Sequence, residues 1–589
     1  MGSTRGGTCR RAAVATAAGN NLVARREAMK RALLRRLAVP AALLLAFAPT
    51  GAGSTATAQS VAATYSYRLL AKAQPDECFA GVGVPYPVGP PCATGQPKVN
   101  QAYVWGMTKV STKIWFGTGA NVHCVVGGAT LALAQPILND DYVCEYGESQ
   151  IIVQNPTVPA SVGDQRRPEV FIWDTATQTL TRKTDDIMNA SAADQLRLRA
   201  TLGLRAAGSF NGVVLFGGPG LGTSINMFAF NSTTGQYLGS AGFQQYGNIR
   251  HFLVAGNALY AGVGVGRNGE LSGNVLRWTG SVTDPFNFVN VGTLPAQAAD
   301  LAIYDGRIAV STWSTINADT PAKRAGIWVS PILANGQPGL NEEDANGWQQ
   351  VWEVGQYDPD LTVASSYGLG GLYEYGGQLY WSTMHVPLKS SSVFLLRYPQ
   401  PDDTAKCNAI YNTLRAISVW RGSGLGTSTA HVDMLYGEST MKKYDPAGNK
   451  GVGSWSDQPT GWTAVYGRSG FGGNPFLNYG WVMREASGKL FIGVMDWAYL
   501  LKGRLGSSTC GHKFGDYDNW GGELWVFEDP NRPATPVNTT GFGNILNYGV
   551  RTMVTDGNKL YLGMANPMNL RTDRTQSTGG WELIELTIG

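Results

Sequence analysis

Polar and aromatic side chains recur beside short apolar segments, where they are suited to hydrogen bonding and acid–base chemistry. Amide and phenol groups together bind sugars or peptides through planar hydrogen bonds and aromatic stacking. We therefore take the following as candidate ligand-binding residues: Tyr246, Asn248, Arg267, His385, Asn478, Tyr479, Asp496, Trp497, Asn547, Tyr548, Asn566 and Asn569.

The repeated Asn-Tyr-Gly at residues 478–480 and 547–549 has a second explanation. Asn and Gly tolerate the left-handed backbone conformation of turns, and a Tyr ring can pack between neighbouring repeats. A polar binding site and ordinary turn chemistry both stay open at this point.

Acid–base catalysis has one candidate pair, His385 and Asp496, because each follows a predicted strand on the same side of its repeat. The five histidines have no metal-site spacing, and neither a Gly-x-Ser-x-Gly nor a phosphate-loop motif occurs. The acidic segments 140–145 and 342–344 lack the spacing of calcium loops. We expect no cofactor, with calcium as the single alternative.

The elements that carry these residues are apolar runs that alternate and close on Gly or Ser. A second apolar segment follows each run, such as Val393–Leu396. Eight copies occur, closing at Gly117, Gly217, Gly262, Ser311, Ser382, Gly437, Gly493 and Gly563. Four antiparallel strands in each unit of roughly 40 to 50 residues are typical of an all-β fold, the β-propeller. We predict eight blades, with seven as the alternative because the copy around Met434 matches least well.

The two ends of the chain predict how the ring closes. The final unit stops after its third strand, whereas a lone strand-like stretch, Ala62–Leu70, precedes the first unit. We expect this stretch to supply the missing outer strand, which leaves no sheet edge open.

The segment from Phe230 to Gly235 (Phe-Asn-Ser-Thr-Thr-Gly) resembles part of a quinoprotein dehydrogenase blade, and Trp173–Thr177 does so less closely. The chain thus resembles secreted bacterial propellers of the broad kelch and quinoprotein-like sort. It lacks the tryptophan-docking motif and calcium ligands of those enzymes, the sialidase Asp-box and the WD40 pairs. The resemblance implies a fold and no specific activity.

The leader indicates export. A basic region (Lys30-Arg31, Arg35-Arg36), an apolar region (Leu37–Phe47) and Ala56-Thr57-Ala58 predict a signal peptide cleaved after Ala58, with translation starting at Met29 as an alternative. We expect a secreted or periplasmic protein. Six cysteines remain after cleavage, and proximity favours the pairs Cys78–Cys92, Cys124–Cys144 and Cys407–Cys510, although other connectivities stay open.

Three regions follow from these signals: a leader (1–58), a closing strand with a Pro-rich, disulfide-pinned segment (59–100), and the propeller (101–589) with an inserted loop at 118–167. A net charge of +4 over 589 residues gives no case for nucleic-acid binding, and no later apolar run is long enough to span a bilayer. We expect a monomer that binds an extracellular glycan or protein. The alternative is an extracellular hydrolase or lyase.

Overall fold

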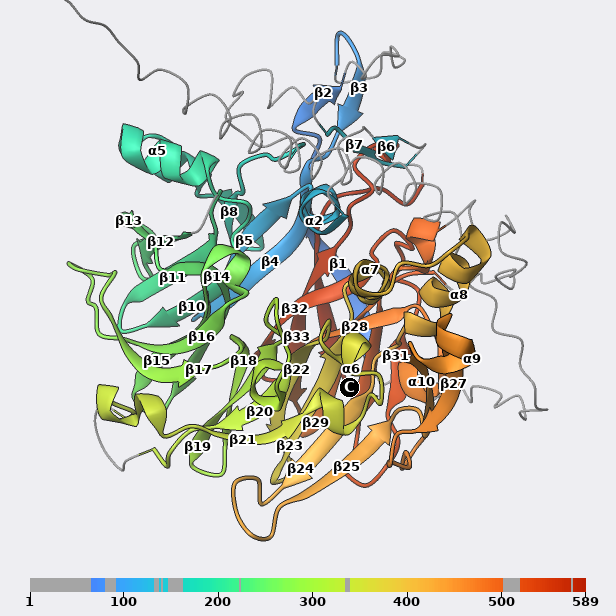
Figure 1. Cartoon of the computed structure of the whole chain (residues 1–589). Coiled ribbons are helices and arrows are strands. Elements are labelled where there is room, and N and C mark those ends of the chain that lie inside the picture. The colour runs from blue at the N-terminus through green and yellow to red at the C-terminus, as the bar shows by residue number, and fades with distance from the viewer. Residues whose placement is uncertain are drawn as a thin grey trace, which may run out of the picture. The chain divides into compact units, whose positions relative to one another are not determined.

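The computed structural model describes residues 65–79, 92–131, 137–138, 141–146, 163–221, 224–333, 339–501, 520–573 and 576–589. Antiparallel strands dominate this part of the chain (Figure 1), as expected for an all-β fold. The described residues from 65 to 500 and from 520 to 589 belong to one compact unit, and this unit holds seven four-stranded blades.

The first four blades use sixteen strands in chain order. Blade 1 consists of β4 (Gln101–Val110), β5 (Lys113–Ala120), β8 (Val170–Asp174) and β9 (Thr179–Arg182). Blade 2 consists of β10 (Ala206–Phe210), β11 (Val213–Pro219), β12 (Ile225–Asn231) and β13 (Tyr237–Phe243). Blade 3 consists of β14 (Tyr246–Ala255), β15 (Ala258–Val265), β16 (Ser272–Trp278) and β17 (Phe288–Leu294). Blade 4 consists of β18 (Gln297–Tyr304), β19 (Arg307–Trp313), β20 (Gly326–Val329) and β21 (Gln349–Glu353).

The last three blades complete the ring. Blade 5 consists of β22 (Gly368–Tyr375), β23 (Gln378–Met384), β24 (Val419–Ser423) and β25 (His431–Tyr436). Blade 6 consists of β28 (Leu477–Ala486), β29 (Lys489–Asp496), β30 (Glu523–Phe527) and β31 (Thr535–Asn538). Blade 7 consists of β32 (Gly549–Asp556), β33 (Lys559–Ala565), β34 (Glu582–Ile588) and β1 (Tyr65–Lys72). Each inner strand contacts the inner strands of both neighbouring blades, and β32 contacts β4.

The closing strand is confirmed. β1 pairs antiparallel with β34 from Tyr65 opposite Ile588 to Lys72 opposite Glu582. Arg68 and Lys72 also form ion pairs with Glu585 and Glu582. The first described strand is therefore the outermost strand of the last blade, and it covers an edge that would otherwise be open.

The expectation of eight blades was wrong, because the weakest repeat is not a separate unit. The run at Met434 lies in β25, the fourth strand of blade 5. The segment Val393–Leu396 is not a strand but part of α7 (Lys389–Arg397), where Phe394 packs against Tyr444 and Trp455. A short apolar run does not by itself distinguish a strand from a buried helical turn.

Tight turns explain why each inner hairpin forms. The turn between β10 and β11 is Asn211-Gly212, with φ of 43° and 81°, and the turn between β18 and β19 is Asp305-Gly306, with φ of 46° and 68°. Positive φ at both central residues is the geometry of a type I′ turn, whose twist matches that of the strands. Between blades, buried aromatic rings form the core, as Trp352 does against Trp381 and Trp420.

Short elements decorate the blades. The helices are α2 (Val122–Leu131), α4 (Thr184–Met188), α5 (Ala192–Arg199), α6 (Leu361–Ala364), α7, α8 (Asp403–Thr413), α9 (Gly448–Gly451) and α10 (Ser469–Gly473). Three two-stranded sheets pair β2 (Glu77–Phe79) with β3 (Gln96–Lys98), β6 (Ile137–Leu138) with β7 (Val143–Cys144), and β26 (Thr440–Asp445) with β27 (Ser454–Pro459). No helix among the described residues is long and apolar enough to cross a membrane.

Two of the three predicted disulfides are confirmed, Cys78–Cys92 and Cys124–Cys144. Cys407 is also disulfide-bonded, and its predicted partner Cys510 lies outside the described residues. Disulfides of this kind are typical of extracellular proteins. The predicted leader and cleavage site also lie outside the described residues, so they stay predictions.

Candidate functional site

The inner strands are interrupted by bulges. In every blade except blade 2, the pairing of the inner strand with its neighbour shifts register part-way along. The residues that the shifts leave unpaired include Trp105, Arg250, Asp300, Trp481 and Arg551. A bulge redirects a side chain that regular alternation would place elsewhere. Bulges therefore select which large side chains lie beside the axis of the ring.

Aromatic rings from four blades form a connected set, here called the aromatic belt: Tyr103, Trp105, Trp313, Tyr479, Trp481 and Tyr548. Tyr103 contacts Trp105, Trp481 and Tyr548 with ring centroids 5.9 to 6.0 Å apart. Trp481 contacts Tyr479, and Tyr479 contacts Trp313 at 6.5 Å. Five of these rings are buried, whereas Tyr479 is partly exposed. Tyr479 is thus the member of the belt most open to a ligand.

Glycines make room for the belt. A Cβ atom at Gly549 would collide with the Trp481 ring, and one at Gly368 would collide with the Trp313 ring. These glycines follow Tyr548 and Tyr367 in the repeated Tyr-Gly pairs. The lack of a side chain at Gly549 and Gly368 therefore allows close packing between neighbouring blades. Trp313 is fixed further because its Nε1 donates to the carbonyl of Leu369 at 2.9 Å.

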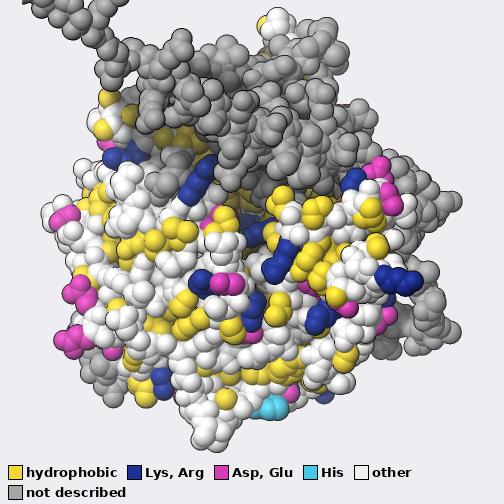
Figure 2. Space-filling model, in the orientation of Figure 1, with side chains coloured by type: hydrophobic (Ala, Val, Ile, Leu, Met, Phe, Trp, Pro, Cys, Tyr) yellow, Lys and Arg dark blue, Asp and Glu magenta, His cyan; other side chains and the backbone are white. Residues whose placement is uncertain are grey.

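Arginines lie over the belt. The guanidinium of Arg250 is 3.6 Å from the centroid of Trp313, that of Arg205 is 5.4 Å from Trp105, and that of Arg551 is 5.8 Å from Trp481. Arg205, Arg250 and Arg551 belong to blades 2, 3 and 7, and their guanidinium groups are close enough for their charges to act on one another. We call these three residues the arginine cluster. Figure 2 shows basic side chains gathered near the middle of the displayed face.

The positive charge of the cluster is weakly compensated. Burial and the charge of neighbouring arginines lower the pKa values of Arg205 and Arg250, and burial lowers that of Arg551. Asp300 is the carboxylate that acts on all three, and it accepts a hydrogen bond from the Gly371 amide at 2.8 Å. Among the described residues, no member of the cluster forms an ion pair.

The predicted Asn-Tyr-Gly residues divide into two groups. Tyr479 and Tyr548 belong to the belt, whereas the asparagines hold the backbone. Asn478 donates to the Arg415 carbonyl at 3.2 Å, and Asn547 donates to Glu582 at 2.6 Å. The asparagines thus hold neighbouring segments through hydrogen bonds of their buried side chains, and neither has the left-handed backbone conformation of a turn.

The remaining candidates do not converge on one site. Asn566 donates to Asn547, Asn569 donates to Asn121 and to the Val143 carbonyl, and both are buried. Trp497 is buried against Phe476, Tyr246 packs in the core between blades 2 and 3, and Arg267 is exposed. Asn248 does lie beside the arginine cluster, since it accepts a hydrogen bond from Arg205 at 3.2 Å.

His385 and Asp496 are held by separate partners in blades 5 and 6. The His385 ring packs on Tyr367 and bonds to Thr383, and burial lowers its pKa to about 3. Its role as an acid or base together with Asp496 stays a prediction. Asp496 accepts a hydrogen bond from Asn474 at 3.0 Å, and the same Asn474 nitrogen donates to Glu523 at 3.1 Å.

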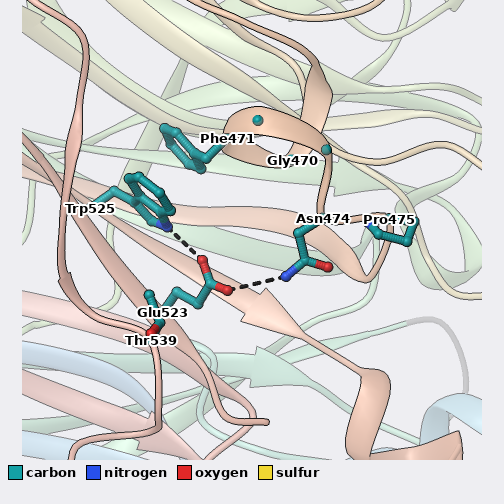
Figure 3. Close-up of a pocket in the computed structure, with 9 residues that line it drawn as sticks. Gly470, Phe471, Asn474, Pro475, Glu523, Trp525 and Thr539 are labelled. Carbon is teal, nitrogen blue, oxygen red and sulfur yellow. Dashed lines mark hydrogen bonds between the residues drawn. The ribbon is translucent and has the colours of Figure 1, made fainter. Parts of the chain in front are cut away.

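Glu523 lies in a cavity of about 480 Å³ between α10 and β30 (Figure 3). Phe471 and Trp525 stack in this cavity with centroids 4.5 Å apart, and Trp525 donates to Glu523 at 2.6 Å. Burial, followed by the charge of Asp496, raises the pKa of Glu523 above its usual range. A carboxyl group kept protonated beside an aromatic platform can act as a general acid. The sequence motifs did not point to Glu523.

The predicted acidic segments have structural partners in the parts that the structure describes. Asp141 pairs with Arg571, and Glu145 lies in a buried network with Lys98 and Asp164. Asp344 caps the short helix Glu342–Asn346. Across the described residues, no group of three or more His, Cys, Asp or Glu side chains is placed to hold a metal ion.

The sequence analysis did not find the arginine cluster, because Arg250 and Arg551 lie inside strands and Arg205 directly precedes β10. One signal was available: the pattern Tyr-x-Trp occurs at both 103–105 and 479–481, in equivalent inner strands. The arginines have no such shared motif.

Comparisons with known proteins add little about activity. No protein-family model matches the chain, and no curated protein does. A puromycin-hydrolysing peptidase of Mycobacterium tuberculosis is similar over 79% of this chain at 8% identity and a TM-score of 0.35. This chain spans about half of that peptidase, since 49% of it is covered.

Two further solved structures are similar at comparable levels. The propeller domain of the trilobed protease of Pyrococcus furiosus matches over 74% of this chain and 98% of that domain, with 6% identity and a TM-score of 0.27. An α-L-arabinanase of Penicillium chrysogenum, complexed with arabinobiose, matches over 65% and 92%, with 8% identity and a TM-score of 0.31. The β-propeller assignment therefore rests on the strand pairing described above.

Proposed function

We propose that this protein is an extracellular β-propeller that binds a glycan at the axis of its ring, where the aromatic belt lies. The observation that supports this most is the belt itself, in which connected rings from four blades include the partly exposed Tyr479. Aromatic faces bind the apolar faces of sugar rings, and nearby amides and guanidinium groups bind hydroxyls. Asn248 and Gln297 supply such amides.

The arrangement of donors fits a binding role. Arg205 donates to Asn248, and Arg250 donates to Gln297 at 3.2 Å, so polar groups of blades 2, 3 and 4 are held in fixed positions. Fixed donors limit the entropy lost on binding. The opposite side of the axis presents Tyr479 of blade 6, with the buried Tyr548 beside Trp481. A ligand at the axis would thus meet a polar side and an aromatic side.

A glycan array followed by titration calorimetry tests this proposal. We expect a glycan found on the array to bind wild-type protein and to bind Tyr479→Ala more than about tenfold more weakly, because the accessible ring is lost. Tyr67→Ala on the outermost strand of blade 7 is the matched control, and it should bind as wild type does. Equal affinity of all three proteins would contradict the proposal.

Hydrolysis is a second candidate, and the Glu523 cavity is the observation that favours it. A protonated carboxyl and a second carboxylate, Asp496, share one Asn474 nitrogen beside stacked rings. Two carboxyl groups in different protonation states are what glycosidic bond cleavage uses. New reducing ends after incubation with a polysaccharide panel, absent with Glu523→Gln, would establish this activity. Products that are unchanged by Glu523→Gln would exclude this cavity as their source.

A further inference from the structure

The arginine cluster has more positive charge than its surroundings balance. Arg205, Arg250 and Arg551 come from three different blades, and Asp300 is the one carboxylate whose charge acts on all of them. Like charges held together away from bulk water destabilise a fold unless a counter-charge is present. The uncompensated charge therefore lowers the stability of the folded protein, and a bound counter-charge would explain why these arginines lie together.

Hydrogen-bonding capacity in the cluster is also unused. The Nε of Arg205 is buried and has no partner, and the Arg551 side chain forms no hydrogen bond among the described residues. A guanidinium group has five donors in a planar fork that matches carboxylate and sulfate oxygens. Buried donors are ordinarily satisfied, so each unsatisfied one needs a reason.

The backbone contributes to the same arrangement. Arg250 and Arg551 are unpaired residues of inner-strand bulges, whereas Arg205 directly precedes the unbulged β10. All three keep part of their surface accessible to water. The tryptophans beneath them hold the guanidinium planes without neutralising the charge.

We infer that the arginine cluster is the binding site for the anionic group of an acidic saccharide, a carboxylate or a sulfate, whose sugar ring stacks on the aromatic belt. This inference rests on the proposed glycan-binding function and names its ligand class. Bidentate guanidinium contacts would hold the anion, and Tyr479 would contact the ring. The balancing charge that the fold lacks would then come from the ligand.

Calorimetric titration with tetragalacturonate and its fully methyl-esterified form tests the carboxylate, since esterification removes each negative charge and adds only a methyl group. A sulfated galacto-oligosaccharide with its unsulfated parent tests the sulfate. We expect one acid to bind about ten- to a hundredfold more tightly than its neutral partner, as charge-assisted hydrogen bonds predict. Added NaCl should reduce this preference.

Arg551→Met separates binding from structure. We expect it to abolish the preference for the acid and to raise the melting temperature without ligand, because it removes like-charge repulsion and keeps a similar volume. Arg324→Met is the control: it breaks the buried ion pair with Glu353 and should lower the melting temperature without changing the preference. A lower melting temperature for Arg551→Met with the preference intact would assign the cluster a structural role and overturn the inference.

The outcomes distinguish the inference of an anionic ligand from the proposed glycan-binding function on which it rests. If each acid and its neutral partner bind equally well and Tyr479→Ala weakens both, the glycan-binding function stands and the anionic ligand is wrong. If neither acidic nor neutral saccharides bind, the anionic-ligand inference and the glycan-binding function are both wrong. Stabilisation by inorganic sulfate alone, without any saccharide binding, would reduce the cluster to a site for small anions and overturn the assignment to a saccharide.

Discussion

Arg250 and Arg551 occupy the same place in two different blades, because each is left unpaired by a bulge on its inner strand. Each guanidinium also lies over the tryptophan of an adjacent blade, Trp313 at 3.6 Å and Trp481 at 5.8 Å. The bulged arginine is therefore repeated in the two blades, whereas its tryptophan comes from β19 of the following blade in one case and from β28 of the preceding blade in the other. Such an arrangement places cationic groups at the axis while the tryptophan stays in the core.

The hydroxyls of Tyr479 and Tyr548 should matter for binding and not for folding. No hydrogen bond from either hydroxyl occurs within the described residues, and Phe keeps the ring and its packing. We expect the double Tyr-to-Phe variant to keep the wild-type melting temperature and to lose about 0.5 to 1.5 kcal/mol of glycan affinity for each hydrogen bond to ligand. Calorimetry that shows full affinity would mean that the belt acts by stacking alone.

Removal of β1 should destabilise the whole ring. Deleting residues 65–72 exposes the edge of β34 and removes the ion pairs to Glu585 and Glu582. We expect a loss of about 2 kcal/mol or more in unfolding free energy, together with aggregation through the open edge. Chemical denaturation and light scattering measure the two effects. The control is Arg68→Ala, which removes only a partly exposed ion pair and should cost no more than about 1 kcal/mol of unfolding free energy. If the deletion costs no more than this control, the role of β1 in closing the ring is contradicted.

Glu523 should make stability depend on pH. Its pKa is raised in the folded state to about 8 by burial and by Asp496. The folded protein therefore binds a proton that the unfolded chain releases near its usual pKa, so stability falls as pH rises from about 4.5 to about 8. We expect Glu523→Gln to match wild type at pH 4.5 and to be more stable at pH 8.5 by at least about 1.4 kcal/mol, the value of one pKa unit.

Thermal unfolding across this pH range checks the Glu523 prediction. The exposed Glu343→Gln is the control, and its melting temperature should follow that of wild type at every pH. A constant offset between Glu523→Gln and wild type would show that the pKa of Glu523 is not raised in the folded protein.

Lys98 should contribute strongly to the stability of the segment that precedes blade 1. It is fully buried and contacts Asp164 at 3.0 Å and Glu145 at 3.2 Å. Lys98→Met leaves Arg166 as the cation beside both carboxyl groups, at 3.3 Å from Asp164 and 4.0 Å from Glu145. Because the more deeply buried of the two cations is lost, we expect the substitution to cost about 3 kcal/mol of stability. Urea denaturation measures the loss, with the exposed pair Lys323–Asp319 as a comparison. A loss below about 1 kcal/mol for Lys98→Met, as expected for Lys323→Met, would refute the prediction.

The sequence by itself was enough to predict the closing strand, the hairpin turns and most of the blade strands, although Val393–Leu396 proved helical. Alternation with a period of two and turns such as Asn211-Gly212 are local properties, so they can be read without knowing the fold. The pairs Cys78–Cys92 and Cys124–Cys144 were accessible for the same reason, because their partners are close in the chain.

Only the tertiary structure decided the number of blades and the composition of the axis. Met434 reads as the start of a repeat, yet its strand pairs as the outer edge of blade 5. A bulge shifts register by one residue and thereby reverses which side chains face inward, so alternation could not place Arg250 or Arg551. The contact of Trp313 with Tyr479 joins strands that lie far apart in the sequence, and closure of the ring is what brings them together.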